Sequence, residues 1–115
     1  MGSERWAEAT AAAFTMLTQP VCAEVAKPEW WHDEGLKALS ARVVRAAPDD
    51  GMAYQMRALV LSGRCDAWEA EPRSAAELKA AAKHFDRAAA LHPAPAMKAQ
   101  HAAAAAWCRT KAGAV

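Results

Sequence analysis

A chain of 115 residues, 54% of them hydrophobic, is long enough to bury one core and too apolar to be a disordered tail. The sequence contains 33 alanines and no isoleucine, which favours closely packed helices and argues against a sheet rich in β-branched residues. The net charge is +1, with acids and bases interspersed, so no broad field attracts nucleic acid or an anionic membrane. We therefore expect a single all-α domain over residues 1–115 that does not bind nucleic acid.

Helix start and stop signals along the chain predict five helices. Ser3 can cap the first helix, and Pro28 suits the first turn of the second because its fixed φ and missing N–H fit that position. The predicted helices cover residues 4–18, 29–47, 51–62, 75–91 and 94–111.

The third and fourth predicted helices have the clearest terminal signals. Asp49 or Asp50 can cap the third helix, and Gly63 is placed as its C-terminal stop. Ser74 and Glu77 have the spacing of a capping box, in which each side chain accepts a backbone N–H that the helix start leaves free. Gly113 is expected to lie just beyond the fifth helix.

The connections between the helices alternate in length. Two connections of about ten residues, 19–28 and 64–73, alternate with short turns that contain proline. We expect two antiparallel helical hairpins and a closing helix, because short turns join antiparallel neighbours.

One segment of the chain is repeated at an offset of 45 residues. Self-similarity at such a period is typical of helical repeat arrays, whose units bury faces against their neighbours. The matching residues are Arg42, Pro48, Met52, Gln55, Ala58 and Arg64 in one copy, and Arg87, Pro93, Met97, Gln100, Ala103 and Arg109 in the other.

The repeated segment resembles the tetratricopeptide repeat family between about Leu36 and Trp107. Two patterns carry the resemblance: Ala81, Phe85, Ala88 and Pro93 have the spacing of the family's second helix, and residues 54–58 followed by Gly63 are similar to its first helix. The chain departs from the family in its long connections, which stretch a repeat of about 34 residues toward 45. The resemblance implies a short solenoid of stacked helical hairpins.

The resemblance also implies that the first helix of each unit lines a concave groove. The groove positions it implies are Met52, Gln55, Leu59, Met97, Gln100 and Ala104. Methionine adapts its shape to a ligand and glutamine can bond an extended peptide, but packing within the core explains these residues equally well. The family's clamp for a terminal carboxylate uses asparagine, and the chain contains none, so we do not expect that clamp.

The five tryptophans have two explanations. Most are expected to pack inside the molecule, but an exposed indole is also a favoured interface anchor, and Trp31 and Trp68 are the candidates. Trp68 stands in a long connection beside two glutamates, an odd place for an indole unless that connection folds back onto the helices.

No catalytic residue, metal site or cofactor is predicted. His32, Asp33 and Glu34 combine a histidine with two acids, but consecutive helical residues point in different directions and cannot converge on one atom. The helix macrodipole explains acids in a first helical turn. The other histidines lack the i, i+4 spacing of a helical zinc site, and no phosphate-binding loop is present.

The cysteines and the hydropathy pattern bear on location. Cys22, Cys65 and Cys108 form no CxxC pair, so we expect reduced thiols in an intracellular compartment, with the cytoplasm favoured over an organelle. An intermolecular disulfide or a redox role is the alternative. The longest uncharged stretch, residues 9–23, is too short to span a bilayer, and the N-terminus lacks the apolar stretch of a secretory signal.

Two classes of function follow from the sequence. In the first, the chain is a non-enzymatic adaptor that binds a peptide or helix of a partner protein through Met52, Gln55, Leu59, Met97, Gln100, Trp31 and Trp68. In the second, it is a structural subunit of a larger assembly or a self-associating module, since the alanine-rich fifth helix has few polar residues over 102–108. The sequence does not identify the partner.

Overall fold

The computed structural model describes residues 2–22 and 24–115, and the protein is all-helical within them, as the composition predicts. These residues form five α-helices and one 3₁₀-helix, η1 (Pro20–Cys22). The α-helices are α1 (Gly2–Leu17), α2 (Asp33–Ala46), α3 (Gly51–Ser62), α4 (Ala75–Leu91) and α5 (Pro95–Ala114). None of these helices is both long and apolar enough to cross a membrane.

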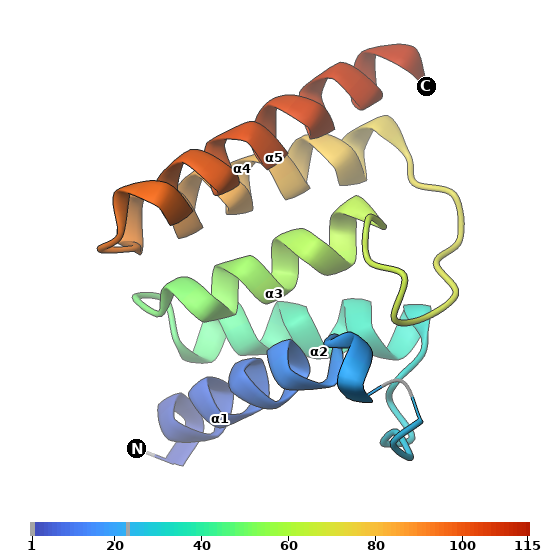
Figure 1. Ribbon diagram of the computed structural model, residues 1–115, viewed down its shortest axis with the longest axis vertical. Coiled ribbons are helices and arrows are strands. Elements are labelled where there is room, and N and C mark those ends of the chain that lie inside the picture. The colour runs from blue at the N-terminus through green and yellow to red at the C-terminus, as the bar shows by residue number, and fades with distance from the viewer. Residues whose placement is uncertain (1, 23) are drawn as a thin grey trace.

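The helices stack in chain order, and consecutive helices run antiparallel (Figure 1). Contacts join α1 to α2 and α3, and then α2 to α3, α3 to α4 and α4 to α5. Consequently α1 and α5 form the two ends of the stack, and α1, α3 and α5 run in the same direction, in front of α2 and α4 in Figure 1.

The core consists of two apolar clusters that lie on either side of α3. The first joins α1, α2 and α3 and includes Phe14, Leu36 and Met56. The second joins α3, α4 and α5 around Phe85 and is filled largely by alanines, which let these helices approach closely. Leu59 of α3 packs against both clusters, so α3 connects the two halves of the core.

The predicted caps of α3 and α4 are confirmed. The Asp50 side chain accepts a hydrogen bond from the Met52 backbone N–H, and Gly63 ends α3 with a left-handed φ of 65°. Ser74 and Glu77 form the reciprocal capping box at the start of α4. The bounds of these two helices coincide with the predicted ranges.

The second helix begins four residues later than predicted. Its N-cap is His32, whose side chain accepts a hydrogen bond from the Gly35 backbone N–H, and Pro28 precedes the helix in irregular chain. The cause is tertiary: Trp31 packs against the Phe14 ring, with ring centroids 5.5 Å apart, and its indole N–H donates to the Ala67 carbonyl. The chain around Trp31 is thereby held in a non-helical path.

Each outer helix extends past its predicted range at one end: α1 begins at Gly2 rather than at residue 4, and α5 ends at Ala114 rather than at residue 111. Ser3 lies inside α1 rather than capping it, and α5 continues through Gly113 to Ala114. A helical glycine costs only about 1 kcal/mol relative to alanine, and a favourable helix can include one when no left-handed turn is required. The predictions of Ser3 as a cap and Gly113 as a stop were therefore wrong.

Candidate functional site

The predicted groove residues of α3 and α5 meet in one surface groove of about 620 Å³. Gln55 and Leu59 line it from α3, and Met97, Gln100 and Ala104 line it from α5. Five further residues complete the lining: Arg64, Phe85, His101, Ala103 and Trp107. Met52 is not among them and lies exposed in the first turn of α3.

The 45-residue repeat explains why residues of α3 and α5 line the same groove. Gln55 and Gln100 are equivalent in the two copies, and so are Leu59 and Ala104. Because α3 and α5 run in the same direction, equivalent positions are presented on the same side of the stack (Figure 1). The side chains of Ala103 and Ala104 on α5 are small, which leaves space between α3 and α5.

One fixed positive charge lines the groove. The Arg64 guanidinium lies over the Trp107 ring, 4.6 Å from its centroid, in a cation–π contact. Trp107 is 40% exposed, so the indole and its charged neighbour are both accessible to a ligand. None of the described residues that line the groove is acidic.

His101 is a buried polar group in the lining of the groove. It is 5% exposed and stacks on Phe85, with ring centroids 6.2 Å apart. Its Nε2 has no hydrogen-bond partner among the described residues. Burial, together with the charge of His92, lowers the pKa of His101, which favours the neutral imidazole near neutral pH.

Trp31 and Trp68 lie away from this groove, in an aromatic cluster with Phe14. Trp68 is only 9% exposed, and its ring centroid is 6.0 Å from that of Trp31 and 5.9 Å from that of Phe14. The connection between α3 and α4 thus folds back onto α1 and α2. Core packing accounts for Trp68, while Trp31 stays partly accessible.

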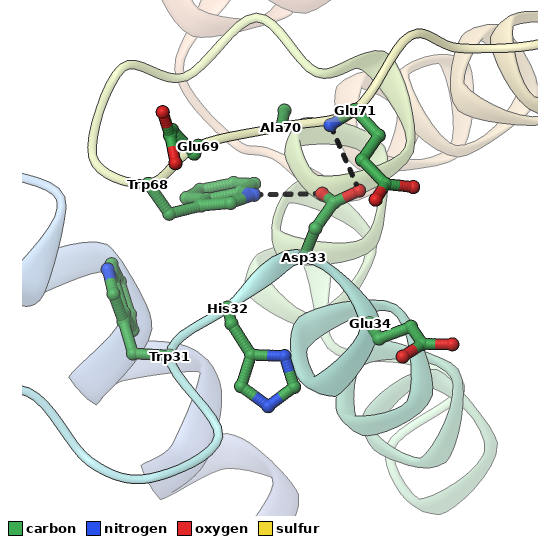
Figure 2. A pocket seen from close by; sticks show the side chains of 8 residues that line it. All are labelled: Trp31, His32, Asp33, Glu34, Trp68, Glu69, Ala70 and Glu71. Atoms are coloured by element: carbon green, nitrogen blue, oxygen red, sulfur yellow. Dashed lines mark hydrogen bonds between the residues drawn. The ribbon is translucent and has the colours of Figure 1, made fainter.

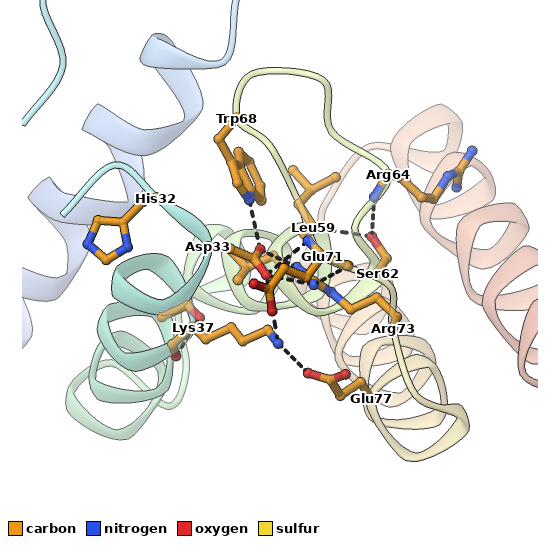
Figure 3. A network of polar contacts seen from close by, with 12 residues as sticks. His32, Asp33, Lys37, Leu59, Ser62, Arg64, Trp68, Glu71, Arg73 and Glu77 are labelled. Atoms are coloured by element: carbon orange, nitrogen blue, oxygen red, sulfur yellow. Dashed lines mark hydrogen bonds and ion pairs between the residues drawn. The ribbon is translucent and has the colours of Figure 1, made fainter.

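Asp33 is the centre of a polar network that the sequence did not predict (Figure 3). Its carboxylate accepts hydrogen bonds from the Trp68 indole N–H at 3.0 Å and the Glu71 backbone N–H at 3.2 Å. Arg73 donates to both carboxylate oxygens, at 2.8 and 2.5 Å, and its side chain is 4% exposed. The sequence explained Asp33 by the helix macrodipole alone and missed Arg73, because no local pattern links residues 40 positions apart.

The ionic state of Asp33 follows from these contacts. The Arg73 hydrogen bond is the largest cause that holds the pKa of Asp33 well below its usual range, and it outweighs the opposing effect of burial. Lys37 extends the network to α4, where its ammonium lies 2.7 Å from Glu77. The network therefore joins α2, the second long connection and the start of α4.

A second cavity, of about 660 Å³, lies beside this network and is lined in part by His32, Asp33 and Glu34 (Figure 2). The three consecutive side chains point in different directions: Asp33 faces Trp68, while His32 and Glu34 point away from it. Among the residues that the structure describes, no group of three histidine, cysteine or acidic side chains is placed to hold a metal ion. His32, Asp33 and Glu34 thus do not converge on one point in this cavity.

Comparisons of this chain with protein-family models, with curated proteins and with solved structures find no match.

Proposed function

We propose that this protein is a non-enzymatic interaction module that binds a peptide or helix of a partner protein in the groove between α3 and α5. The observation that carries the proposal is the meeting of Gln55, Leu59, Met97 and Gln100 in one groove. Gln55 and Gln100 occupy equivalent positions of the internal repeat, and the four residues combine amide groups with adaptable apolar side chains. Such a lining suits the backbone and side chains of a peptide.

The packing of the two repeat copies supports a build like that of tetratricopeptide repeats. Arg42 stacks on the Trp6 ring of α1 at 4.9 Å, and its repeat equivalent Arg87 stacks on the Tyr54 ring of α3 at 5.7 Å. In both copies an arginine of the second helix thus contacts an aromatic ring of the helix before it. Repeated contacts of this kind are expected where similar units stack on their neighbours.

A pair of matched variants tests the proposal. Ala103 and Ala102 are adjacent exposed residues of α5, but only Ala103 lines the groove. Glutamine is a good helix former, so Ala103→Gln should obstruct the groove and leave the fold intact, and Ala102→Gln is the control. Tagged wild-type protein and both variants would be used to recover partners from extracts of the native cells, with mass spectrometry as the readout.

We expect one protein to be recovered in near-equal amount with the wild-type protein and with Ala102→Gln, and to be lost or strongly depleted with Ala103→Gln. Circular dichroism of each variant would verify that it remains helical. Recovery of the same partners with all three proteins, or of none with any, would overturn the proposal that this groove is a binding site.

Self-association is a second candidate function, favoured by apolar surface on the outer helices. Trp6 of α1 is 37% exposed and Trp107 of α5 is 40% exposed, and Ala102 and Ala106 of α5 also face solvent. Sedimentation equilibrium over a range of concentrations would distinguish the two functions. An adaptor is expected to keep the mass of one chain, whereas a self-associating module would gain mass with concentration.

A further inference from the structure

The two helices that form the walls of the groove contain no acidic residue. The whole chain has 13 aspartates and glutamates, yet none lies in the 12 residues of α3 or the 20 residues of α5. Arg109 of α5 is paired with Asp86 of α4, whereas Arg64, which follows the C-cap Gly63 of α3, adds a positive charge to the groove itself. The described lining residues therefore have one positive charge, that of Arg64, and no negative charge.

Apolar surface lies next to this charge. The Arg64 guanidinium covers part of the Trp107 ring, and Leu59, Phe85 and Met97 line the same groove. A ligand side chain that packs on this surface would bring its neighbouring residues within reach of Arg64. An acidic residue beside an apolar one therefore matches the arrangement in both charge and polarity.

The amide groups add a requirement for polar contacts along the ligand. Gln55 and Gln100 line the groove from opposite helices, and each offers a donor and an acceptor. The unpartnered Nε2 of His101 is a further polar group in the lining. A backbone in extended conformation presents N–H and C=O groups on both edges, whereas a helix satisfies those groups internally. An extended segment therefore makes better use of this lining than a helix does.

We infer that the ligand of this groove is an extended peptide segment in which an acidic side chain is adjacent to an apolar anchor. The inference rests on the proposed function and specifies the chemistry of the partner. The acidic group is a side-chain carboxylate within the segment, and a free terminal carboxylate is not required.

The experiment is a selection from a displayed library of short random peptides. The library would be selected in parallel on the wild-type protein and on Ala103→Gln, and only sequences that bind the wild-type protein alone would be kept. We expect these groove-dependent sequences to be enriched in aspartate and glutamate next to an apolar residue, relative to the unselected library. They would then be synthesised with acetylated and amidated ends, so that no terminal charge contributes.

The sign of the charge is tested with a second pair of variants. Arg64→Lys and Arg64→Glu keep or reverse the positive charge that lines the groove, and neither substitution enlarges the side chain. We expect Arg64→Lys to bind the synthetic peptides at least about tenfold more tightly than Arg64→Glu, as measured by fluorescence anisotropy. Arg42 covers the Trp6 ring outside the groove, and Arg42→Lys and Arg42→Glu should differ much less from each other.

The possible failures are distinguishable. Groove-dependent peptides that are neutral or basic, or equal affinities of Arg64→Lys and Arg64→Glu, would overturn the inference and leave the proposed function standing. A selection without any groove-dependent peptide would count against both. Occupation of the groove by a second copy of the chain would appear as self-association that Ala103→Gln abolishes, and it too would overturn the inference.

Discussion

Asp33 holds together parts of the chain that are distant in sequence, and its removal is expected to be costly. Asp33→Asn would leave the buried Arg73 guanidinium without its counter-ion. Breaking such a pair typically costs about 3–5 kcal/mol, and we expect a loss near the lower limit because the Arg73 side chain also donates to the Val60 and Glu71 carbonyls. Urea unfolding at pH 7 would measure this. The control is Glu34→Gln, an exposed acid in the same helical turn, with an expected change within about 0.5 kcal/mol.

The contribution of Asp33 should depend on pH in a defined direction. Its pKa is depressed in the folded protein, chiefly by Arg73, while the unfolded chain has the ordinary value of about 3.9. Below about pH 5 the unfolded chain increasingly binds the extra proton, so the stabilisation is complete above this pH and declines as the pH falls. The difference in unfolding free energy between wild type and Asp33→Asn should therefore shrink between about pH 5 and pH 2. A difference independent of pH would argue against the ion pair.

His101 should make the protein less stable at acid pH because it is buried as a neutral imidazole without a charge partner among the described residues. Its pKa is lowered by burial, so below the unfolded value of about 6.5 the unfolded chain binds more protons and the native state loses stability. Replacing His101 with leucine removes both this proton linkage and the unpartnered Nε2. We expect His101→Leu to be neutral or stabilising at pH 7, and to lose less stability than wild type between pH 7 and pH 5, in thermal or urea unfolding. An unchanged pH dependence would contradict this account.

At the scale of the element, two glycines near helix ends are expected to respond oppositely to alanine. Gly63 has a φ of 65°, and a Cβ there would lie 3.2 Å from Arg73 Cγ. Gly63→Ala should therefore destabilise the protein by about 1 kcal/mol or more. Gly113 lies in α5, and a Cβ added there would meet no described atom within 4 Å, so Gly113→Ala should stabilise the protein by up to about 1 kcal/mol. Chemical denaturation of both variants would test this, and equal effects would contradict the difference in backbone conformation.

The local caps of α3 and α4 were predicted correctly, whereas the start of α2, which depends on tertiary contacts, was not. The caps at Asp50 and Ser74 involve residues within three positions of each other, so the sequence identified them. The start of α2 depends on Trp31, which bonds to Ala67, 36 residues away. No pattern in a single sequence specifies a contact of that kind.

The lining of the groove was likewise only partly predictable from the sequence. Gln55 and Gln100 were predicted as groove residues because the resemblance to tetratricopeptide repeats implies these positions, which are equivalent in the two copies of the repeat. Arg64, His101 and Trp107 were not predicted as groove residues, because their place in the lining depends on how the helices pack. The resemblance and the repeat therefore indicated which helices line the groove, and the structure revealed that Arg64 gives it a positive charge.

At the scale of the whole molecule, the stack predicts a gradient of local stability. The middle helix α3 contacts α1, α2 and α4 and buries six residues, including Met56, Val60 and Leu61. The terminal helix α1 buries Ala7, Ala11 and Phe14. In a stack of helices each element depends on its neighbours, so an end helix can open while the rest stays folded, and a middle helix cannot.

Native-state hydrogen exchange would measure this gradient. We expect amides in the core of α3 to exchange only through global unfolding, with a free energy equal to that from denaturant unfolding. Amides of α1 should exchange through local opening at a lower free energy, because α1 is covered on one side only and presents Trp6 and Met16 to solvent. Equal protection of α1 and α3 would mean that the two apolar clusters unfold as one unit. In that case the molecule would behave as a single globule, since independent opening of terminal units is what distinguishes a stack of repeats.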